Sequence, residues 1–151
     1  MSGNTPINGR DIVASSSADD LMAAYHSIQT GSYENLITLI EKDTSIVHAT
    51  FADGSTLLHW AAQRIDGMRI VKLLVNHGAD VNHSSGSVGE IPLMWAVRNQ
   101  FLAPTVRYLL ENGSHVNHRN VYGQDVLSVA CQAGHPTIAF ILYVPRRIFV
   151  I

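Results

Sequence analysis

Short apolar runs with helical spacing alternate with polar, glycine-containing turns over most of the chain. Three segments share one pattern, in which a glycine and a polar residue precede an apolar run: 54–62, 89–97 and 123–131. Their glycines lie 35 and 34 residues apart. Similar segments recurring every ~20–50 residues are typical of repeat proteins. The pattern therefore predicts a stack of similar helical units.

A second recurring segment follows the first two of these. Residues 71–82 and 106–117 each contain an apolar helix-like run that ends at a glycine. Gly78 and Gly113 suit the ends of these helices, because a left-handed backbone is favoured there and glycine has no side chain to oppose it. Each unit is thus predicted to be a helix, a turn and a second helix.

The starts of the first helices carry their own signals. Thr56 and Asp125 can each accept a backbone N–H of the helix that follows, which is the role of an N-cap. Pro92 suits a first helical position, where the N–H that proline lacks is not needed. Residues 21–42 hold a less regular unit, predicted as two short helices hinged at Gly31.

The motifs resemble those of the ankyrin repeat. The resemblance rests on Gly54 to Ala62 and its two copies, on Gly134-His135, and on the Gly-Ala-Asp turn at residues 78–80. It implies an all-α ankyrin-repeat solenoid of about four helix–turn–helix repeats, in which each unit buries its apolar face against a neighbour. The predicted repeats span about 20–52, 53–87, 88–121 and 122–142.

The resemblance also marks one polar position. His59 stands where the family makes side-chain hydrogen bonds, but the equivalent residues are Met94 and Ser128. Those bonds are therefore not expected in the last two repeats.

Both ends of the chain depart from the repeat. Residues 1–19 are rich in Ser, Asn and Gly and are predicted to be disordered. Residues 143–151 form a non-repeat tail that suggests truncation, in which Pro145 is expected to end the last helix. The apolar face of the last repeat is then expected to stay uncovered.

Composition narrows the classes of function. The formal net charge is −2 and the basic residues are scattered, which argues against nucleic acid as a partner. No signal peptide or lipidation motif is present, and Cys131 is the only cysteine, so a reducing, cytoplasmic setting is expected. Residues 126–145 carry no Asp, Glu, Lys or Arg, yet Gly134 and Pro136 favour two short helices over membrane insertion.

Two tryptophans are the leading candidates for partner binding. Trp60 and Trp95 occupy the same repeat position, which the resemblance places on the first helix facing the concave groove. Tryptophan is enriched at binding hot spots. Arg64 and Asn99 follow four residues later and should share that helix face. The alternatives are that the rings cover gaps between repeats and that the polar pair is solvated.

The hairpin tips add further candidates. Phe51 and Tyr122 are candidates for partner contacts, because ankyrin proteins often contact partners through such tips. Polar tip residues are equally compatible with ordinary turns. The polar residues at the predicted tips are Asp53, His83, His118, Arg119 and Asn120.

Few residues in the sequence indicate catalysis or cofactor binding. Cys131 falls at a position that is packed and interior in ankyrin repeats, so a buried and inert thiol is expected. A metal site of His83, His115 and His118 is the weaker alternative to histidines that vary within the repeat. No phosphate loop or catalytic triad is present. We predict a chain that is not an enzyme and has no cofactor.

A closer resemblance is to the N-terminal ankyrin domain of palmitoyltransferases of the huntingtin-interacting kind. It rests on the segments 31–34, 56–62 and 92–96, and on the glycine-rich turn at 84–89. That family recruits substrates through short linear motifs on the cytosolic side of the Golgi or other endomembranes. Trp95 then matches its groove tryptophan, whereas Arg64 stands where an amide is expected. The catalytic Asp-His-His-Cys motif is absent from this chain.

Three functions are therefore open. The first is a protein-binding module that takes a partner or a short peptide in its groove. The second is the substrate-recruiting fragment of a membrane protein S-palmitoyltransferase. The third is an inert scaffold with no specific ligand.

Overall fold

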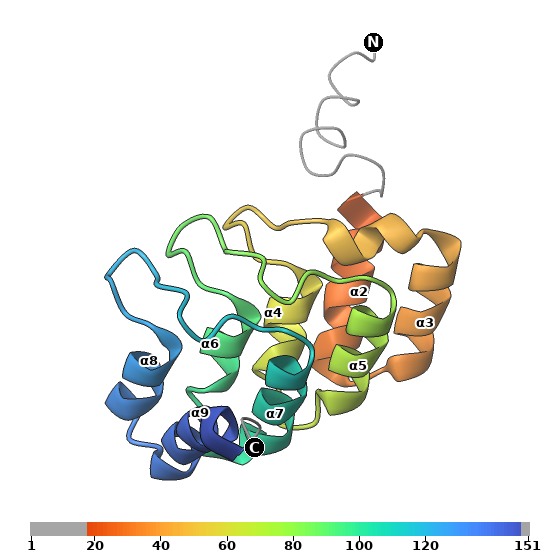
Figure 1. Ribbon diagram of the computed structural model, residues 1–151. Helices are drawn as coiled ribbons and strands as arrows, with labels where there is room; N and C mark the ends of the chain where they lie inside the picture. Colours follow the sequence, from red (N-terminus) through yellow and green to blue (C-terminus); the bar gives the residue numbers. More distant parts are fainter. Residues whose placement is uncertain (1–17, 149–151) are drawn as a thin grey trace.

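Every repeat folds as two helices joined by a short turn, as the alternation of apolar runs and glycines predicts (Figure 1). The computed structural model describes residues 18–148, and for 144–148 only the backbone. The helices are α2 (Ala18–Thr30), α3 (Tyr33–Lys42), η1 (Thr44–His48), α4 (Leu57–Ala62), α5 (Met68–Asn76), α6 (Pro92–Ala96), η2 (Gln100–Leu102), α7 (Ala103–Glu111), α8 (Val126–Gln132) and α9 (Pro136–Ile148).

The helices form two layers. The first helices of the repeats, α2, α4, α6 and α8, contact one another in sequence, and so do the second helices, α3, α5, α7 and α9. Figure 1 shows the first repeat at one end of this stack and α8 and α9 at the other. Between residues 18 and 148 there is no strand, only an isolated bridge between Thr50 and Thr56. The prediction of an all-α ankyrin-type solenoid is confirmed.

The core runs continuously through the stack. Leu58 and Leu93 are fully buried in α4 and α6, and Leu74 and Leu109 are fully buried in α5 and α7. Burial of one such side chain stabilises the fold by about 1.5–3 kcal/mol. Small side chains at equivalent positions allow the helices to approach closely, and all of them are fully buried: Ala61, Ala62, Ala96 and Ala130.

The predicted helix ends are found in the structure. The Asp125 carboxylate accepts the backbone N–H of Ser128 at 2.8 Å, and Pro92 occupies the first turn of α6. Gly78 and Gly113 follow α5 and α7 with φ of 91° and 90°, in the left-handed region. α2 begins at Ala18, inside the segment predicted to be disordered; the rest of that prediction lies outside the described residues.

Removal of the Asp125 cap is expected to cost about 1 kcal/mol of unfolding free energy. Asp125→Ala leaves the Ser128 N–H without its carboxylate acceptor, whereas Asp125→Asn keeps an oxygen at the same place. Urea denaturation should therefore show a clear loss for the alanine variant and little for the asparagine variant. Equal losses in both variants would show that the cap does not stabilise α8.

The end of the last helix differs from expectation. α9 continues through Pro145 to Ile148, so the prediction that Pro145 ends the helix is wrong. Proline removes one backbone donor, but its φ near −65° is itself helical, so a helix can continue beyond it with a kink. None of the helices within residues 18–148 is long and apolar enough to cross a membrane.

Candidate functional site

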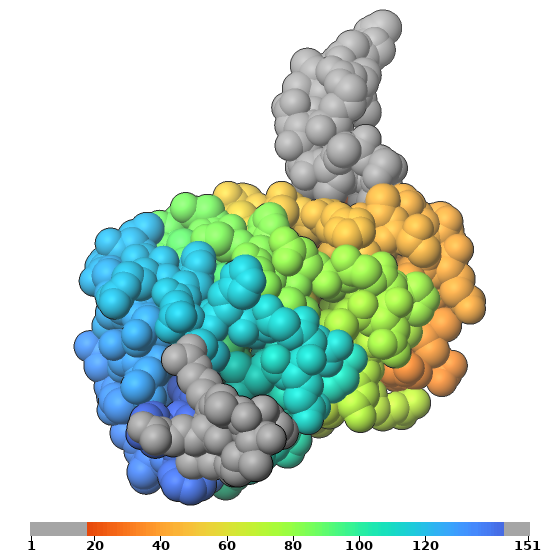
Figure 2. All heavy atoms as spheres, viewed as in Figure 1, coloured from red at the N-terminus to blue at the C-terminus, as the bar shows by residue number. Residues whose placement is uncertain are grey.

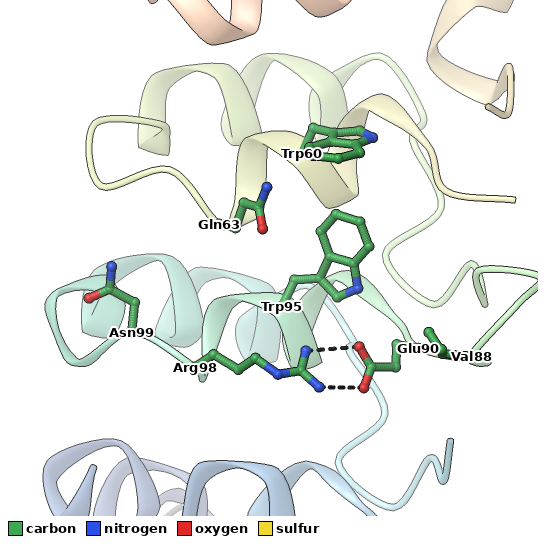
Figure 3. A pocket seen from close by; sticks show the side chains of 7 residues that line it. All are labelled: Trp60, Gln63, Val88, Glu90, Trp95, Arg98 and Asn99. Atoms are coloured by element: carbon green, nitrogen blue, oxygen red, sulfur yellow. Dashed lines mark hydrogen bonds and ion pairs between the residues drawn. The ribbon is translucent and has the colours of Figure 1, made fainter. Parts of the chain in front are cut away.

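A hollow of about 410 Å³ lies between the first helices of the second and third repeats. Trp60 on α4 and Trp95 on α6 line it, and Figure 3 shows the Trp95 ring directed toward Trp60. The remaining side chains that line it come from the ends of these helices and from the turn before α6: Gln63, Val88, Glu90, Arg98 and Asn99.

The two tryptophans differ in how they are held. Their ring centroids are 5.1 Å apart and the ring planes are perpendicular, the edge-to-face geometry that aromatic rings prefer. The Trp60 indole N–H donates to the Ser55 hydroxyl at 3.0 Å. Within the described part of the chain, the Trp95 indole N–H has no hydrogen-bond acceptor. The hollow therefore presents one aromatic donor that is available to a ligand.

A buried histidine packs against the Trp95 ring of this aromatic pair. The His59 ring lies 5.0 Å from the Trp95 ring and is fully buried. Its Nδ1 accepts the Thr56 backbone N–H at 3.1 Å, and its Nε2–H donates to the Glu90 carbonyl at 2.8 Å. Burial lowers the pKa of His59 to about 4. The ring is therefore neutral near pH 7 and joins the second repeat to the third.

An ion pair closes one side of the hollow. The two Arg98 guanidinium nitrogens donate to the two Glu90 carboxylate oxygens (Figure 3). The Glu90 side chain is 6% exposed and that of Arg98 is 46% exposed. Burial raises the pKa of Glu90, but hydrogen bonds from Arg98 and Asn120 outweigh it and hold the pKa below its usual value. Glu90 in turn raises the pKa of Arg98.

Two amide side chains complete the lining. The side-chain amide oxygen of Asn99 accepts the Phe101 backbone N–H at 2.9 Å, and its NH₂ group makes no hydrogen bond among the described residues. Gln63 is exposed, and no hydrogen bond within residues 18–148 engages its amide. The hollow thus combines aromatic faces, amide donors and a neutralised ion pair.

The structure brings together only part of the predicted site. Trp60, Trp95 and Asn99 line the hollow, whereas Arg64 does not. Arg64 pairs with Asp66 and donates to the Gln29 carbonyl of the first repeat. These bonds hold the Arg64 guanidinium toward the first repeat, whereas Asn99, at the same position after Trp95, makes no contact of that kind.

The other lining residues were missed, although a signal for two of them was present. Gln63 and Arg98 follow the tryptophans by three residues, a spacing that also shares a helix face. Val88 and Glu90 come from the turn before α6, where no periodicity applies.

The predicted tip residues lie apart from the hollow. Phe51 packs edge-to-face against Tyr25 and Trp60, at 5.6 Å and 6.3 Å between centroids, so it extends the aromatic row toward the first repeat. Tyr122 is exposed and its backbone N–H donates to the Asn120 side chain. Asp53 accepts the Ser55 N–H, as an ordinary turn residue does.

The hairpin histidines make contacts between repeats. His83 Nε2 bonds the Gly54 carbonyl at 3.1 Å, and one repeat later His118 Nε2 bonds the Gly89 carbonyl at 2.7 Å. Among the described residues, no group of three or more metal-ligating side chains is found. The repeated contact accounts for these two histidines without a metal.

Cys131 is exposed, so the expectation of a buried thiol was wrong. The equivalent residues of the two preceding repeats, Ala62 and Val97, are fully buried. The difference arises because no described helix follows the fourth repeat.

Comparison with known families decides the relationship. The family model for ankyrin repeats (3 copies) matches residues 70–148 of the sequence. The family model for a single ankyrin repeat matches residues 53–85. The chain belongs to the ankyrin-repeat family. A search of curated proteins found no match.

Family membership sets the class of function. Ankyrin repeats generally mediate protein–protein interactions, and ankyrin domains are typically non-catalytic. A protein is thus the kind of partner to seek for this ankyrin stack.

Proposed function

We propose that this ankyrin stack binds an extended, uncharged peptide segment of a partner protein in the hollow between α4 and α6. The observation that carries the proposal is the half-buried Trp95, whose indole N–H has no acceptor within the described chain. A peptide carbonyl supplies such an acceptor, and an apolar side chain of the peptide packs on the Trp60 and Trp95 rings.

The charges around the hollow favour an uncharged peptide. Arg98 is neutralised by Glu90 inside the hollow, and Arg64 is neutralised by Asp66 beside it. A charged peptide side chain would lose its hydration and find no unpaired opposite charge in the lining. Peptide carbonyls, by contrast, are matched by the amide groups of Gln63 and Asn99.

The experiment is a peptide array probed with the purified chain, followed by titration of the best peptide. Trp95→Ala is expected to weaken that binding about 30-fold, because loss of a central tryptophan typically costs at least ~2 kcal/mol. Tyr122→Ala is the matched control, since Tyr122 is an exposed aromatic residue outside the hollow. It should leave the affinity unchanged.

Two results would overturn the proposal. The first is equal binding by wild type and Trp95→Ala; the second is a best peptide that loses affinity only with Tyr122→Ala, which would move the site to the hairpin tips. If no peptide on the array binds, the inert-scaffold function is favoured instead.

A second candidate is the recruiting fragment of a membrane palmitoyltransferase. One observation favours it: Trp95, which the closer resemblance identifies with a groove tryptophan, lines the hollow. This candidate rests on motif residues alone. Reading the gene downstream tests it, because membrane spans and an Asp-His-His-Cys motif are required. Their absence would exclude it.

Both candidates imply a cytosolic location, in the second case at an endomembrane surface. Microscopy of a tagged full chain tests this proposal. A secreted or lumenal signal would contradict it.

A further inference from the structure

Three cationic residues lie together on the outer sides of α5 and α7, although they are scattered in the sequence. Arg69 and Lys72 are three residues apart on α5, a spacing that shares a helix face, and Arg107 is on α7. The two helices contact each other, and Figure 2 shows their surfaces, in green and blue-green, adjoining on one face. All three residues are exposed. We call Arg69, Lys72 and Arg107 the cationic patch.

The cationic patch lacks the partners that other cations of the chain have. The remaining Lys and Arg residues whose side chains the structure describes each make an ion pair or a hydrogen bond: Lys42, Arg64, Arg98 and Arg119. Within residues 18–143, no ion pair or hydrogen bond engages Arg69, Lys72 or Arg107. These three residues are therefore the described cations that remain available to a partner.

Nearby acidic residues do not neutralise the cationic patch. Glu111, at the end of α7, is the only acidic residue on α5 or α7. On the neighbouring α3, Glu34 and Glu41 are exposed. Among the described residues, none of these three carboxylates forms an ion pair with the patch. The positive charge on the outer sides of α5 and α7 is thus uncompensated, and it favours an anionic partner.

Aromatic rings position two of the three cations. The Arg69 guanidinium lies over the Tyr33 ring, 4.0 Å from its centroid, and the Lys72 ammonium lies over the Tyr108 ring at 5.8 Å. A guanidinium stacked on a ring keeps its N–H donors free at its edge, because they lie in the plane of the group. Stacking also reduces the entropy lost when such a side chain is immobilised by a ligand. Arg69 is therefore prepared to bind a carboxylate.

The spread of the three charges indicates the kind of anion. Lys72 and Arg107 occupy equivalent positions of neighbouring repeats, each directly after a valine. Packed helices lie about 8–10 Å apart, and residues three apart on one helix about 5–6 Å. In an extended peptide, alternate side chains point the same way about 6.5–7 Å apart. Several carboxylates along an extended segment match this spread better than a single anionic group does.

A membrane surface fits the cationic patch less well. Basic clusters that bind anionic lipids typically hold about 4–8 Lys or Arg residues, whereas this patch holds three. Among the described residues, no large exposed apolar side chain lies on α5 or α7, so the patch has nothing to insert between lipids. The formal net charge of −2 also opposes approach to an anionic surface.

We propose that the cationic patch binds an extended acidic segment of a partner protein, whose carboxylates pair with Arg69, Lys72 and Arg107. A protein partner agrees with the general role of ankyrin repeats. This inference is independent of the proposed peptide binding, because the hollow between α4 and α6 is lined by first helices and their turns, whereas the patch lies on second helices.

Fluorescence anisotropy of the full chain with a labelled peptide of alternating glutamate and serine tests the proposal. The wild type is expected to bind this peptide, and its affinity should fall several-fold between about 50 mM and about 300 mM NaCl, because salt screens exposed ion pairs. The same peptide with glutamine in place of glutamate should not bind.

Substitutions show whether the cationic patch is the site. Lys72→Gln/Arg107→Gln is expected to weaken binding of the acidic peptide about tenfold, since each exposed ion pair contributes modestly. Lys42→Gln/Arg119→Gln is the matched control, because it removes the same two positive charges from exposed residues elsewhere. It should bind like the wild type. Circular dichroism checks that each variant is folded.

Arg69→Lys tests the stacked guanidinium separately. The substitution keeps the charge but loses the planar group that stacks on Tyr33. Binding of the acidic peptide is expected to weaken a few-fold, with the salt dependence unchanged.

Several outcomes would overturn the proposal. A wild type that does not bind the acidic peptide does so, as does equal binding of the glutamine peptide. Equal losses in the two double variants would show that overall charge, and not the cationic patch, attracts the peptide. Vesicles of phosphatidylcholine and phosphatidylserine, in a roughly 2:1 ratio, serve as the second probe. Binding to these vesicles without binding to the peptide would assign the patch to a membrane surface instead.

Discussion

Lowering the pH from about 7 to about 4.5 is expected to remove about 2–3 kcal/mol of unfolding free energy through His59 alone. In the folded chain, burial lowers the pKa of His59 to about 4, against 6.5 for an ordinary histidine. The unfolded chain therefore takes up a proton first as the pH falls. The stabilisation is complete above about pH 6.5 and is lost progressively toward pH 4.

The effect should be large because His59 has no room for a charge. Its Nδ1 is already an acceptor of the Thr56 N–H, so protonation would place two donors opposite each other. The Nε2 bond to Glu90 connects the second repeat to the third, and the ring packs against Trp95. Lowering the pH is thus expected to weaken the contact between the second and third repeats that shapes the hollow between α4 and α6.

His59→Met isolates this contribution, because Met94 occupies the equivalent position one repeat later and is fully buried there. The variant is expected to be less stable than the wild type at pH 7, since the Thr56 N–H loses its partner. The difference between the two unfolding free energies should then shrink by about 2–3 kcal/mol toward pH 4.5. Urea denaturation at a series of pH values measures it; a constant difference would show that another group carries the acid sensitivity.

Arg98→Met is expected to destabilise the fold by about 2–3 kcal/mol. The substitution leaves the Glu90 carboxylate, 6% exposed, with the Asn120 amide as its remaining side-chain donor. Removal of one partner from a fully buried pair costs about 3–5 kcal/mol, and the half-exposed Arg98 places the cost for this pair below that range. Loss of the ion pair also opens one side of the hollow between α4 and α6.

Arg64→Met is the matched control for this prediction. Arg64 also pairs with an acidic residue at the end of a first helix, but Asp66 is 65% exposed and can be hydrated when its partner is gone. The expected loss is less than about 1 kcal/mol. Thermal or urea unfolding of the two variants side by side gives the comparison. Similar losses in both would mean that burial of Glu90 does not matter to the pair.

The sequence by itself determined the architecture. Repeated glycines, caps and apolar runs are local signals. They specify helix pairs because backbone conformation and amphipathic spacing depend on residues that lie close together in the sequence. Asp125 caps its helix and Gly78 ends one as predicted. The recurrence of Trp60 and Trp95 at one repeat position also singled out two residues that line the hollow.

Only the tertiary structure decided which polar side chains join them. Arg64 is held outside the hollow by Asp66 and by the Gln29 carbonyl of the first repeat, and Glu90 enters the hollow from a turn without periodicity. Cys131 is exposed because no described helix packs on the outer side of α8, whereas Ala62 and Val97 are covered by the repeats that follow them. Burial depends on what the neighbouring repeat covers, and that contact is made between residues more than 30 positions apart, as between His59 and Glu90.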